Sequence, residues 1–314
     1  MATNQALPDP YLSPMTPPPA APWRAPHAPD RLRMAEQLRV TGAGMRQLLA
    51  EFRDARRRSP APPRSARAEG ALRIASWNLH KCVGTDGRFD PHRSIAVIAE
   101  LDADLIALQE ADRRFGRRIG LLDTRLLEEK AGLVPLPISD LADGHGWHGN
   151  AILARPGTRA RLRRLALPGA EPRGAVVADL DMAGGSLRLV AAHFGLLPRC
   201  RRRQSAAILA ALAEAPPMPT VLCGDLNEWN PGERSSLRGL APLFGAVNGG
   251  PASFPARMPV LPLDRIMAWP QALVSDVEVH DSPLARIASD HLPLTACLHL
   301  AAAATGEGAA RAAA

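Results

Sequence analysis

Lysine and aromatic residues are scarce in this sequence. Lys81 and Lys130 are the only lysines among 314 residues, so arginine carries nearly all of the positive charge, and aromatic residues make up 4% of the chain. Leucine, valine, isoleucine and alanine must therefore fill the interior of any folded domain. The hydrophobic content of 46% is enough for one large core or two small ones.

Cysteine is also rare, and no segment resembles a secretory signal or a membrane span. The four cysteines never form a CxxC pair, so neither a zinc site nor a dithiol motif is suggested. We expect reduced, mostly buried thiols, as in a cytosolic protein. The first residues lack a basic start followed by an apolar stretch, and no apolar run is long enough to cross a bilayer. These features predict a cytoplasmic protein, with peripheral membrane contact left open.

Positive charge is concentrated at the N-terminal end of the chain. Of the net charge of +7, residues 1–70 carry +5, from 11 arginines against 6 acidic residues. This distribution does not by itself indicate a nucleic-acid groove in the remainder. Composition and periodicity divide the chain into a disordered proline-rich N-terminus (1–29), a basic amphipathic helical segment (30–57), a linker (58–70), a globular domain (71–300) and a disordered Ala/Gly tail (301–314).

The basic segment 30–57 is compatible with several roles. A basic amphipathic helix can lie on anionic lipid or contact nucleic-acid phosphates. It can equally pack on its own domain or act as a mobile arm. We expect the protein to be a monomer.

The globular part is predicted to contain more strands than helices. Asp90 and Pro91 have the residue types of an N-cap and a first helical position. The expected helices are 91–101, 121–132 and 199–213, and the expected strands are 71–79, 104–112, 150–154, 175–180, 187–192, 220–223, 263–269, 274–279 and 292–300. Because several strands follow one another without a helix between them, a plain doubly wound parallel sheet is excluded. The pattern favours mixed β-structure with helices outside, as two sheets packed face to face.

Polar side chains recur at the ends of these apolar strands. Since strand ends on one edge of a sheet converge, such groups can line one pocket. They are all acids, amides or imidazoles: Asn78, Glu110, His193, Asp225, Asn227, Asp264, Asp290 and His291.

These residue types match the requirements of phosphoester hydrolysis. Mg²⁺ binds carboxylate oxygens and keeps several waters, so Glu110 suits a metal ligand. Asp225 is a candidate base for an attacking water. Asn78, Asn227 and a protonated histidine can donate to the charge that develops on phosphorus oxygens. His291 is suited to be that histidine, because adjacent acids can hold an imidazole in one tautomer and keep it positive.

Other catalytic motifs are absent from the sequence. It has no GxSxG elbow, no Walker lysine motif and no GxGxxG after a strand. The segment HGWHGN at 145–150 lacks the HExxH pattern or cysteine partners of a zinc site, so we expect a loop there.

The order of motifs resembles the endonuclease/exonuclease/phosphatase superfamily, which includes deoxyribonuclease I. The matching segments are SWNLH (76–80), LIALQEAD (105–112), GNAILAR (149–155), AAHFG (191–195), RRRQ (201–204), CGDLNEW (223–229), LDRI (263–266) and SDHLPL (289–294). The resemblance implies a four-layer α/β sandwich, two mixed β-sheets with helices outside, and hydrolysis that depends on Mg²⁺ or Mn²⁺. RRRQ is expected to be structural, with its arginines partly solvated.

The resemblance also implies individual roles. The implied metal ligands are Glu110, Asn78 and Asp290, with Asp290 alternatively supporting the histidine. The implied catalytic residues are Asp225, Asn227, His193, Asp264 and His291, with His193 as general acid on the leaving group and Asp264 orienting His291. Lys81, Asn150 and Arg173 join Asn78 as expected substrate-binding residues, although Asn150 can instead shape its turn and Arg173 can be a surface residue.

The sequence does not identify the substrate. A phosphodiesterase acting on nucleic acid and one acting on a phospholipid or sphingolipid would share the same catalytic core, and a phosphomonoesterase or a non-catalytic binding protein are further alternatives. The loop after Glu110 is rich in arginine and can follow a nucleic-acid backbone or lipid head groups. Substrate choice therefore depends on loops whose arrangement the sequence does not give.

Overall fold

The computed structural model describes residues 72–300, apart from 114–115, 231 and 248. The predicted N-terminal segments 1–29, 30–57 and 58–70 and the predicted tail 301–314 lie outside the described residues. Within the described part, no helix has the length and apolar character needed to cross a membrane.

The first sheet has six strands in the order β10-β11-β1-β2-β4-β3. Their bounds are β1 Leu72–Asn78, β2 Leu105–Gln109, β3 Val134–Pro135, β4 Ala151–Ala154, β10 Val274–Val279 and β11 Leu294–Leu298. β1 pairs in parallel with β2 and antiparallel with β11, so the sheet is mixed.

The second sheet has five strands in the order β5-β6-β7-β8-β9. Their bounds are β5 Arg159–Leu167, β6 Arg173–Met182, β7 Gly185–His193, β8 Thr220–Asp225 and β9 Asp264–Trp269. β7 and β8 are parallel and the other pairs are antiparallel. Both sheets are mixed, as the sequence predicted.

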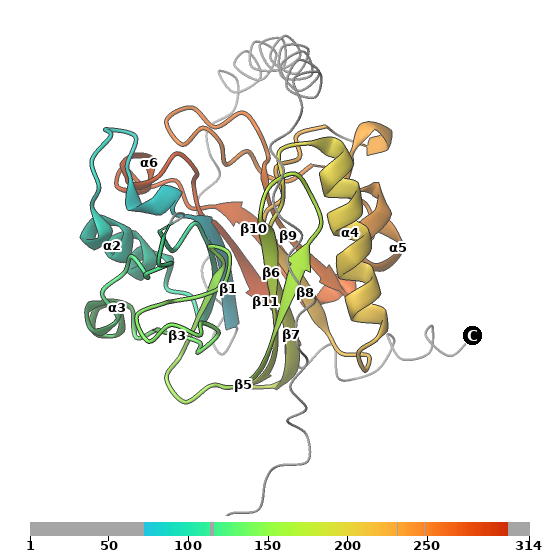
Figure 1. Cartoon of the computed structure of the whole chain (residues 1–314), viewed down its shortest axis with the longest axis horizontal. Helices are drawn as coiled ribbons and strands as arrows, with labels where there is room; N and C mark the ends of the chain where they lie inside the picture. Colours follow the sequence, from blue (N-terminus) through green and yellow to red (C-terminus); the bar gives the residue numbers. More distant parts are fainter. Residues whose placement is uncertain (1–71, 114–115, 231, 248, 301–314) are drawn as a thin grey trace, which may run out of the picture. The chain divides into compact units, whose positions relative to one another are not determined.

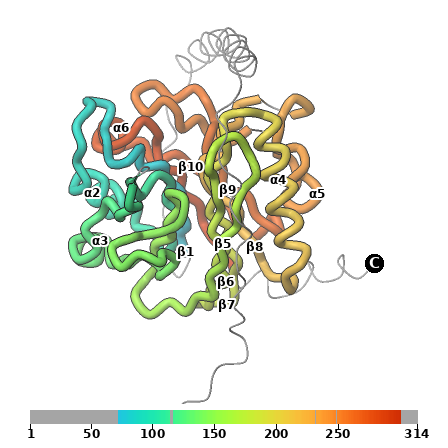
Figure 2. The backbone as a smooth tube through the Cα atoms, in the orientation of Figure 1, coloured from blue at the N-terminus to red at the C-terminus, as the bar shows by residue number. Residues whose placement is uncertain are grey.

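The helices lie outside the two sheets (Figure 1). Their bounds are α2 Pro91–Leu101, α3 Thr124–Ala131, α4 Pro198–Ala213, α5 Ala241–Phe244 and α6 Ala285–Ala288. α2 and α3 flank the six-stranded sheet, and α4 and α5 flank the five-stranded sheet, as the tube in Figure 2 also shows. This is the four-layer α/β sandwich that the resemblance implied.

Three apolar clusters hold these layers together. Ile74 and Val176, from different sheets, belong to the cluster between the sheets, Trp77 belongs to the cluster beneath α2 and α3, and Phe194 belongs to the cluster beneath α4. β4 is buried at every position, which explains why its sequence AILA is uniformly apolar instead of alternating. The four cysteines are free and buried, as expected.

Local sequence signals explain several element boundaries. The side chain of Asp90 accepts a hydrogen bond from the backbone N–H of Arg93 and Pro91 occupies the first helical position of α2, as predicted. The expected helix 121–132 begins later, at Thr124, because Asp123 caps it by accepting from the backbone N–H of Leu126. β5 was not predicted, since four arginines interrupt the apolar residues of its segment RARLRRLAL.

Candidate active site

The five-stranded sheet places three polar residues in register at one end. His193 closes β7, Asp225 closes β8 and Asp264 opens β9. His193 is the parallel partner of Asp225, and Asp225 is the antiparallel partner of Asp264. The expected convergence of strand ends therefore arises from direct pairing of neighbouring strands.

Asp225 lies at the centre of this group. Its Oδ2 accepts a hydrogen bond from Nδ2 of Asn78 at 2.9 Å and lies 3.3 Å from Nε2 of His193. Its Oδ1 accepts from the backbone N–H of Asn227 at 3.0 Å. Burial alone would raise the pKa of Asp225, but His291, His193 and Asn78 outweigh it and hold this pKa well below its usual range. Asp225 is thus a buried carboxylate that stays ionised.

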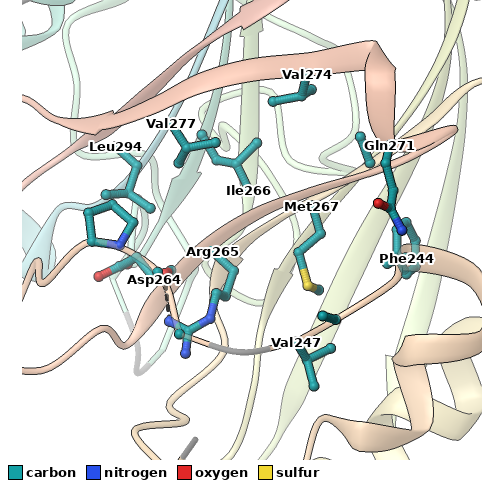
Figure 3. A pocket seen from close by; sticks show the side chains of 15 residues that line it. Phe244, Val247, Asp264, Arg265, Ile266, Met267, Gln271, Val274, Val277 and Leu294 are labelled. Atoms are coloured by element: carbon teal, nitrogen blue, oxygen red, sulfur yellow. Dashed lines mark hydrogen bonds between the residues drawn. The ribbon is translucent and has the colours of Figure 1, made fainter. Parts of the chain in front are cut away.

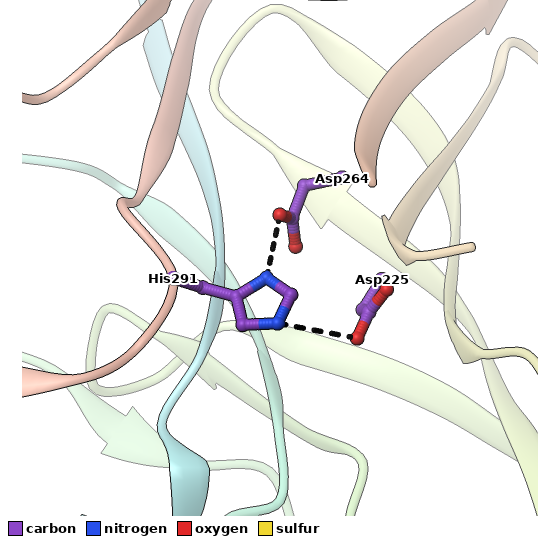
Figure 4. A group of neighbouring side chains, drawn as sticks. All are labelled: Asp225, Asp264 and His291. Carbon is purple, nitrogen blue, oxygen red and sulfur yellow. Dashed lines mark hydrogen bonds and ion pairs between the residues drawn. The ribbon is translucent and has the colours of Figure 1, made fainter. Parts of the chain in front are cut away.

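His291 lies between two carboxylates (Figure 4). Its Nδ1 is 2.8 Å from Oδ2 of Asp264, and its Nε2 is 3.8 Å from Oδ2 of Asp225. Burial alone would lower the pKa of His291, but Asp264, Asp225 and Asp290 raise it to about 10. Asp264 also accepts a hydrogen bond from the hydroxyl of Ser253. The imidazole is therefore a fixed cation at neutral pH.

The segment that carries His291 is docked onto the end of β1. The hydroxyl of Ser289 donates to the backbone carbonyl of Asn78 at 2.7 Å, and Nε1 of Trp77 donates to the carbonyl of His291 at 2.9 Å. These bonds join residues more than two hundred positions apart in the sequence. They hold His291 over the strand that supplies Asn78.

A small cavity of about 30 Å³ adjoins this group through His193. The ammonium of Lys81 pairs with the carboxylate of Glu110 at its wall, and Nη1 of Arg173 lies 2.7 Å from Nε2 of His193. The cavity lining comprises Lys81, Glu110, Asp112, Arg118, His148, Gly149, Pro172, Arg173 and His193. The wall of this small space thus carries three cations, Lys81, Arg118 and Arg173, and two carboxylates.

Two site residues have an unusual backbone conformation. Glu110 and Asn227 have φ values of 53° and 51°, in the left-handed region that non-glycine residues rarely adopt. Such conformations persist where the surrounding structure fixes them, and they cluster at functional sites. Glu110 directly follows β2, and Asn227 lies two residues after the end of β8, where its Nδ2 donates to the carbonyl of Phe194 at 2.9 Å.

Two groups of donors are candidates for a divalent cation. Asp225, Asp264 and His291 are the one group of three acids or histidines in the described ranges whose ligand atoms lie within 4.8 Å of one another. This group already contains a cation, the imidazolium of His291. Glu110 fits a metal better, since burial would raise its pKa but His193, Lys81 and Arg173 lower it overall. A carboxylate that stays ionised and already accepts an ammonium suits a hard cation.

The other expected residues differ in their placement. Oδ1 of Asp290 lies 3.8 Å from Nδ1 of His80, and the charge of Asp290 helps to raise the pKa of His291. Among the described interactions, none joins Asp290 to Glu110. Asn150 is fully buried, and its Nδ2 donates to the carbonyl of Gly174 at 2.9 Å. Its visible contacts shape the turn before β4, so substrate binding by Asn150 stays a prediction.

Some residues of the site were not predicted individually. Arg118 belongs to the arginine-rich loop after Glu110, and its guanidinium pairs with Asp112 at 3.2 Å. His148 lines the cavity, and its Nδ1 is buried with no hydrogen-bond partner among the described residues. Ser253 had no sequence signal, because its loop follows no strand pattern.

A larger cavity, of about 320 Å³, lies along the edge strand β9 (Figure 3). Its walls are mainly apolar, and they include Met267, Phe244 and Val277. Asp264 lines one end, but its Oδ2 bonds to His291 and Ser253. The larger cavity therefore lacks the converging charged groups that line the smaller one.

Comparison with solved structures identifies the same fold in several proteins. An endonuclease/exonuclease/phosphatase from Beutenbergia cavernae is 23% identical, with a TM-score of 0.55 over 73% of this chain and 72% of that chain. Mannosyl-6-phosphatase Bt3783 from Bacteroides thetaiotaomicron is 17% identical, with a TM-score of 0.52 over 72% of this chain and 98% of that chain. TDP2 from D. rerio, complexed with a single strand DNA product, is 16% identical, with a TM-score of 0.53 over 73% of this chain and 99% of that chain.

Sequence comparison points to the same family. No curated protein matches the sequence. The profile of the Endonuclease/Exonuclease/phosphatase family, whose members are generally phosphoester hydrolases, matches residues 75–291. That range runs from β1 to His291 and contains every residue placed in the site above, so the chain belongs to the Endonuclease/Exonuclease/phosphatase family.

Proposed function

We propose that this protein is a divalent-metal-dependent phosphodiesterase in which water attacks phosphorus. The observation that carries the proposal is the position of Asp225, an ionised and buried carboxylate flanked by His193 and His291. A carboxylate beside two imidazoles and the amide of Asn78 can hold a water on one side and a phosphate on the other.

Asp225 is suited chiefly to orient the attacking water. Its low pKa makes it a weak base at neutral pH, while its Oδ2 remains an acceptor for a water proton. Phosphoryl transfer depends mainly on positioning and electrostatic stabilisation, so orientation is the larger contribution expected from this residue. The backbone N–H of Asn227 and the amide of Asn78 keep the carboxylate in place.

His291 is suited to stabilise the charge that develops on the phosphate. Its pKa of about 10 keeps the imidazole protonated, and Asp264 holds Nδ1 so that Nε2 faces the site. A preorganised cation in a site with little water is an effective stabiliser of a transition state that bears extra negative charge. His193 lines the small cavity and is the candidate general acid on the leaving oxygen.

Glu110 is the proposed principal ligand of a magnesium ion, with Asn78 and Asp290 as further candidates. When bound, the ion would neutralise charge on the phosphate oxygens. In the described structure the ammonium of Lys81 pairs with the carboxylate of Glu110. An ion bound to Glu110 would replace that ammonium, and Lys81 would then be free to contact the substrate. Mn²⁺ has a similar preference for oxygen ligands and is an expected substitute.

The proposed substrate is a nucleic-acid phosphodiester. Three cations, Lys81, Arg118 and Arg173, surround the small cavity, and such cations can contact a phosphate backbone. The structural neighbour from D. rerio was captured with a single strand DNA product, which supports this class. The mannosyl-6-phosphatase neighbour keeps a phosphomonoester substrate as an alternative, and phospholipid or sphingolipid diesters are the other alternative.

A substrate panel tests the proposal. The full chain would be incubated with Mg²⁺, or with a chelator, against plasmid and linear DNA, RNA, phospholipid and sphingomyelin vesicles, and sugar phosphates. We expect chelator-sensitive cleavage of nucleic acid. Faster turnover of a lipid or a monoester would replace the proposed substrate while keeping the chemistry, and no turnover of any phosphoester would contradict the hydrolase.

A further inference from the structure

A buried ion pair lies behind the active site. Nη2 of Arg201, on α4, is 3.4 Å from Oε2 of Glu228, and both side chains are 0% exposed. The sequence predicted that the arginines of the RRRQ segment (201–204) are partly solvated. This is wrong for Arg201, which is fully buried. Removing two charges from water is costly and is rarely recovered by their attraction alone. A gain in folding stability therefore does not by itself explain why the pair is buried.

The carboxylate of Glu228 closes the loop that follows β8. Its Oε2 accepts from the backbone N–H of Ser236 at 2.5 Å and from the hydroxyl of the same residue. Its Oε1 accepts from the backbone N–H of Asn230 at 2.8 Å and from the Nδ2 of that side chain at 3.1 Å. One side chain thus satisfies four donors of its own loop in addition to Arg201.

Arg201 connects this loop to the segment that follows β7. Its Nη1 donates to the carbonyl of Leu196 at 2.6 Å, and its Nε donates to the hydroxyl of Ser236 at 2.7 Å. Its guanidinium carbon lies 5.2 Å from the centre of the Trp229 ring, a cation–π contact. One turn further along α4, Gln204 accepts from the backbone N–H of Gly195 through Oε1 at 2.9 Å.

The atoms held by this network lie next to the site residues in the chain. Glu228 directly follows Asn227, and Leu196 lies three positions after His193. Arg265, which follows Asp264 and is drawn in Figure 3, donates from Nη2 to the carbonyl of Glu228 at 3.1 Å. The network therefore reaches all three strands whose ends carry the site.

We propose that Arg201 and Glu228 are positioning residues that fix His193 relative to Asp225. Neither side chain is accessible to a substrate, so both act through the loops that they hold. Misplacement of a catalytic group by about 1 Å can reduce a rate about 10²-fold, which is the scale of the effect expected here. The inference rests on the proposed hydrolase activity, but the effect of the pair on the position of the His193 ring can be tested without that activity.

The test compares Glu228→Gln with a matched control. The control is Asp179→Asn, which breaks the pair of Asp179 with Arg188, 2.6 Å apart at the opposite end of the same sheet. Turnover of a small phosphodiester in Mg²⁺ and the side-chain nitrogen resonances of His193 would be recorded for both. Glu228→Gln is expected to lower kcat about 10²-fold with little change in KM and to shift the His193 resonances. Asp179→Asn is expected to reduce stability alone.

Wild-type kcat and unshifted His193 resonances in Glu228→Gln would overturn the proposal. If that variant does not fold, Arg201→Met combined with Glu228→Gln removes both charges, and Ser236→Ala removes only a hydroxyl. In either variant a reduced kcat supports positioning, and an unchanged kcat overturns it. If the wild type hydrolyses no phosphoester, the proposed function fails, and the His193 resonances alone then decide whether the pair positions that ring.

Discussion

Nδ1 of His291 lies 2.8 Å from Oδ2 of Asp264, and both side chains are almost fully buried. The two residues are 27 positions apart: Asp264 opens β9 of the five-stranded sheet, and His291 lies in the segment that leads into β11 of the six-stranded sheet. Their contact fixes the orientation of the ring and favours its positive charge. The proposed catalytic role of His291 depends on this contact.

Replacement of Asp264 by asparagine should reduce catalysis with little change in shape. The neutral amide no longer favours the imidazolium, so the pKa of His291 should fall and its stabilising charge should be lost at neutral pH. Loss of one such stabilising group typically costs about 10²- to 10³-fold in kcat. Steady-state kinetics at pH 7.5 would measure the loss. Asp179→Asn is the control, and an Asp264→Asn enzyme as fast as that control would refute the assigned role.

The contribution of His291 to stability should depend on pH in a defined window. Its pKa is raised from the ordinary value of 6.5 to about 10 in the folded protein. Stabilisation by the protonated ring is therefore complete below pH 6.5 and is lost as the pH rises toward about 10. Urea unfolding of the wild type and His291→Gln, repeated across this range, should give a difference in unfolding free energy that shrinks with rising pH. A constant difference would contradict the raised pKa.

Glu110 and Lys81 should have opposite effects on magnesium affinity. Glu110→Gln removes the proposed ligand, and the loss should at least match the about 10- to 100-fold caused by removing an outer-shell partner. Lys81→Met removes the ammonium that pairs with Glu110, so Mg²⁺ should bind more tightly. Calorimetric titration measures both without an activity assay. Lys130→Met, at the other lysine of the chain, is the control, and equal affinity in all four proteins would exclude Glu110 as the ligand.

Gly224 should not tolerate a side chain. It lies in β8 directly before Asp225 with φ +143°, and a Cβ there would sit 1.8 Å from the carbonyl oxygen of Ala192. That oxygen belongs to β7 directly before His193, so relief of the clash would separate the two site residues. Gly224→Ala should cost about 1–3 kcal/mol or more in unfolding free energy and should also lower kcat. Gly239→Ala, where a Cβ meets no atom within 4 Å, should change neither, and a Gly224→Ala protein as stable as Gly239→Ala would contradict this account.

Much of the fold could be predicted from the sequence because its signals are local. Asp90 and Pro91 mark the start of α2, and polar residues such as Asn78 and Asp225 mark where apolar strands end. β5, an edge strand, escaped prediction because four arginines interrupt its apolar residues. Arg163 is half-buried there and Arg164 is exposed. An arginine-rich segment carries too weak an alternation to be recognised as a strand.

The site was less predictable, because contacts between distant segments decide it. The pattern indicates that Asn78 and Asp225 each end a strand, but not that the two strands, from different sheets, bring the side chains within 2.9 Å. It also gives no sign that Arg201 is enclosed while Arg202 and Arg203 are exposed. Burial of a charged residue depends on a partner elsewhere in the chain, here Glu228, and that partner is visible only in the folded structure.

The most direct measurement of the central claim is phosphodiester hydrolysis in water enriched in ¹⁸O. A small diester would be incubated with the wild type and with Asp225→Asn, in Mg²⁺ and in chelator, and the product phosphate would be examined by mass spectrometry. We predict one ¹⁸O atom in the phosphate of the wild-type product, no turnover in chelator, and a rate at least about 10²-fold lower for Asp225→Asn. Label that is absent from the phosphate, or an Asp225→Asn protein as active as the wild type, would contradict the account.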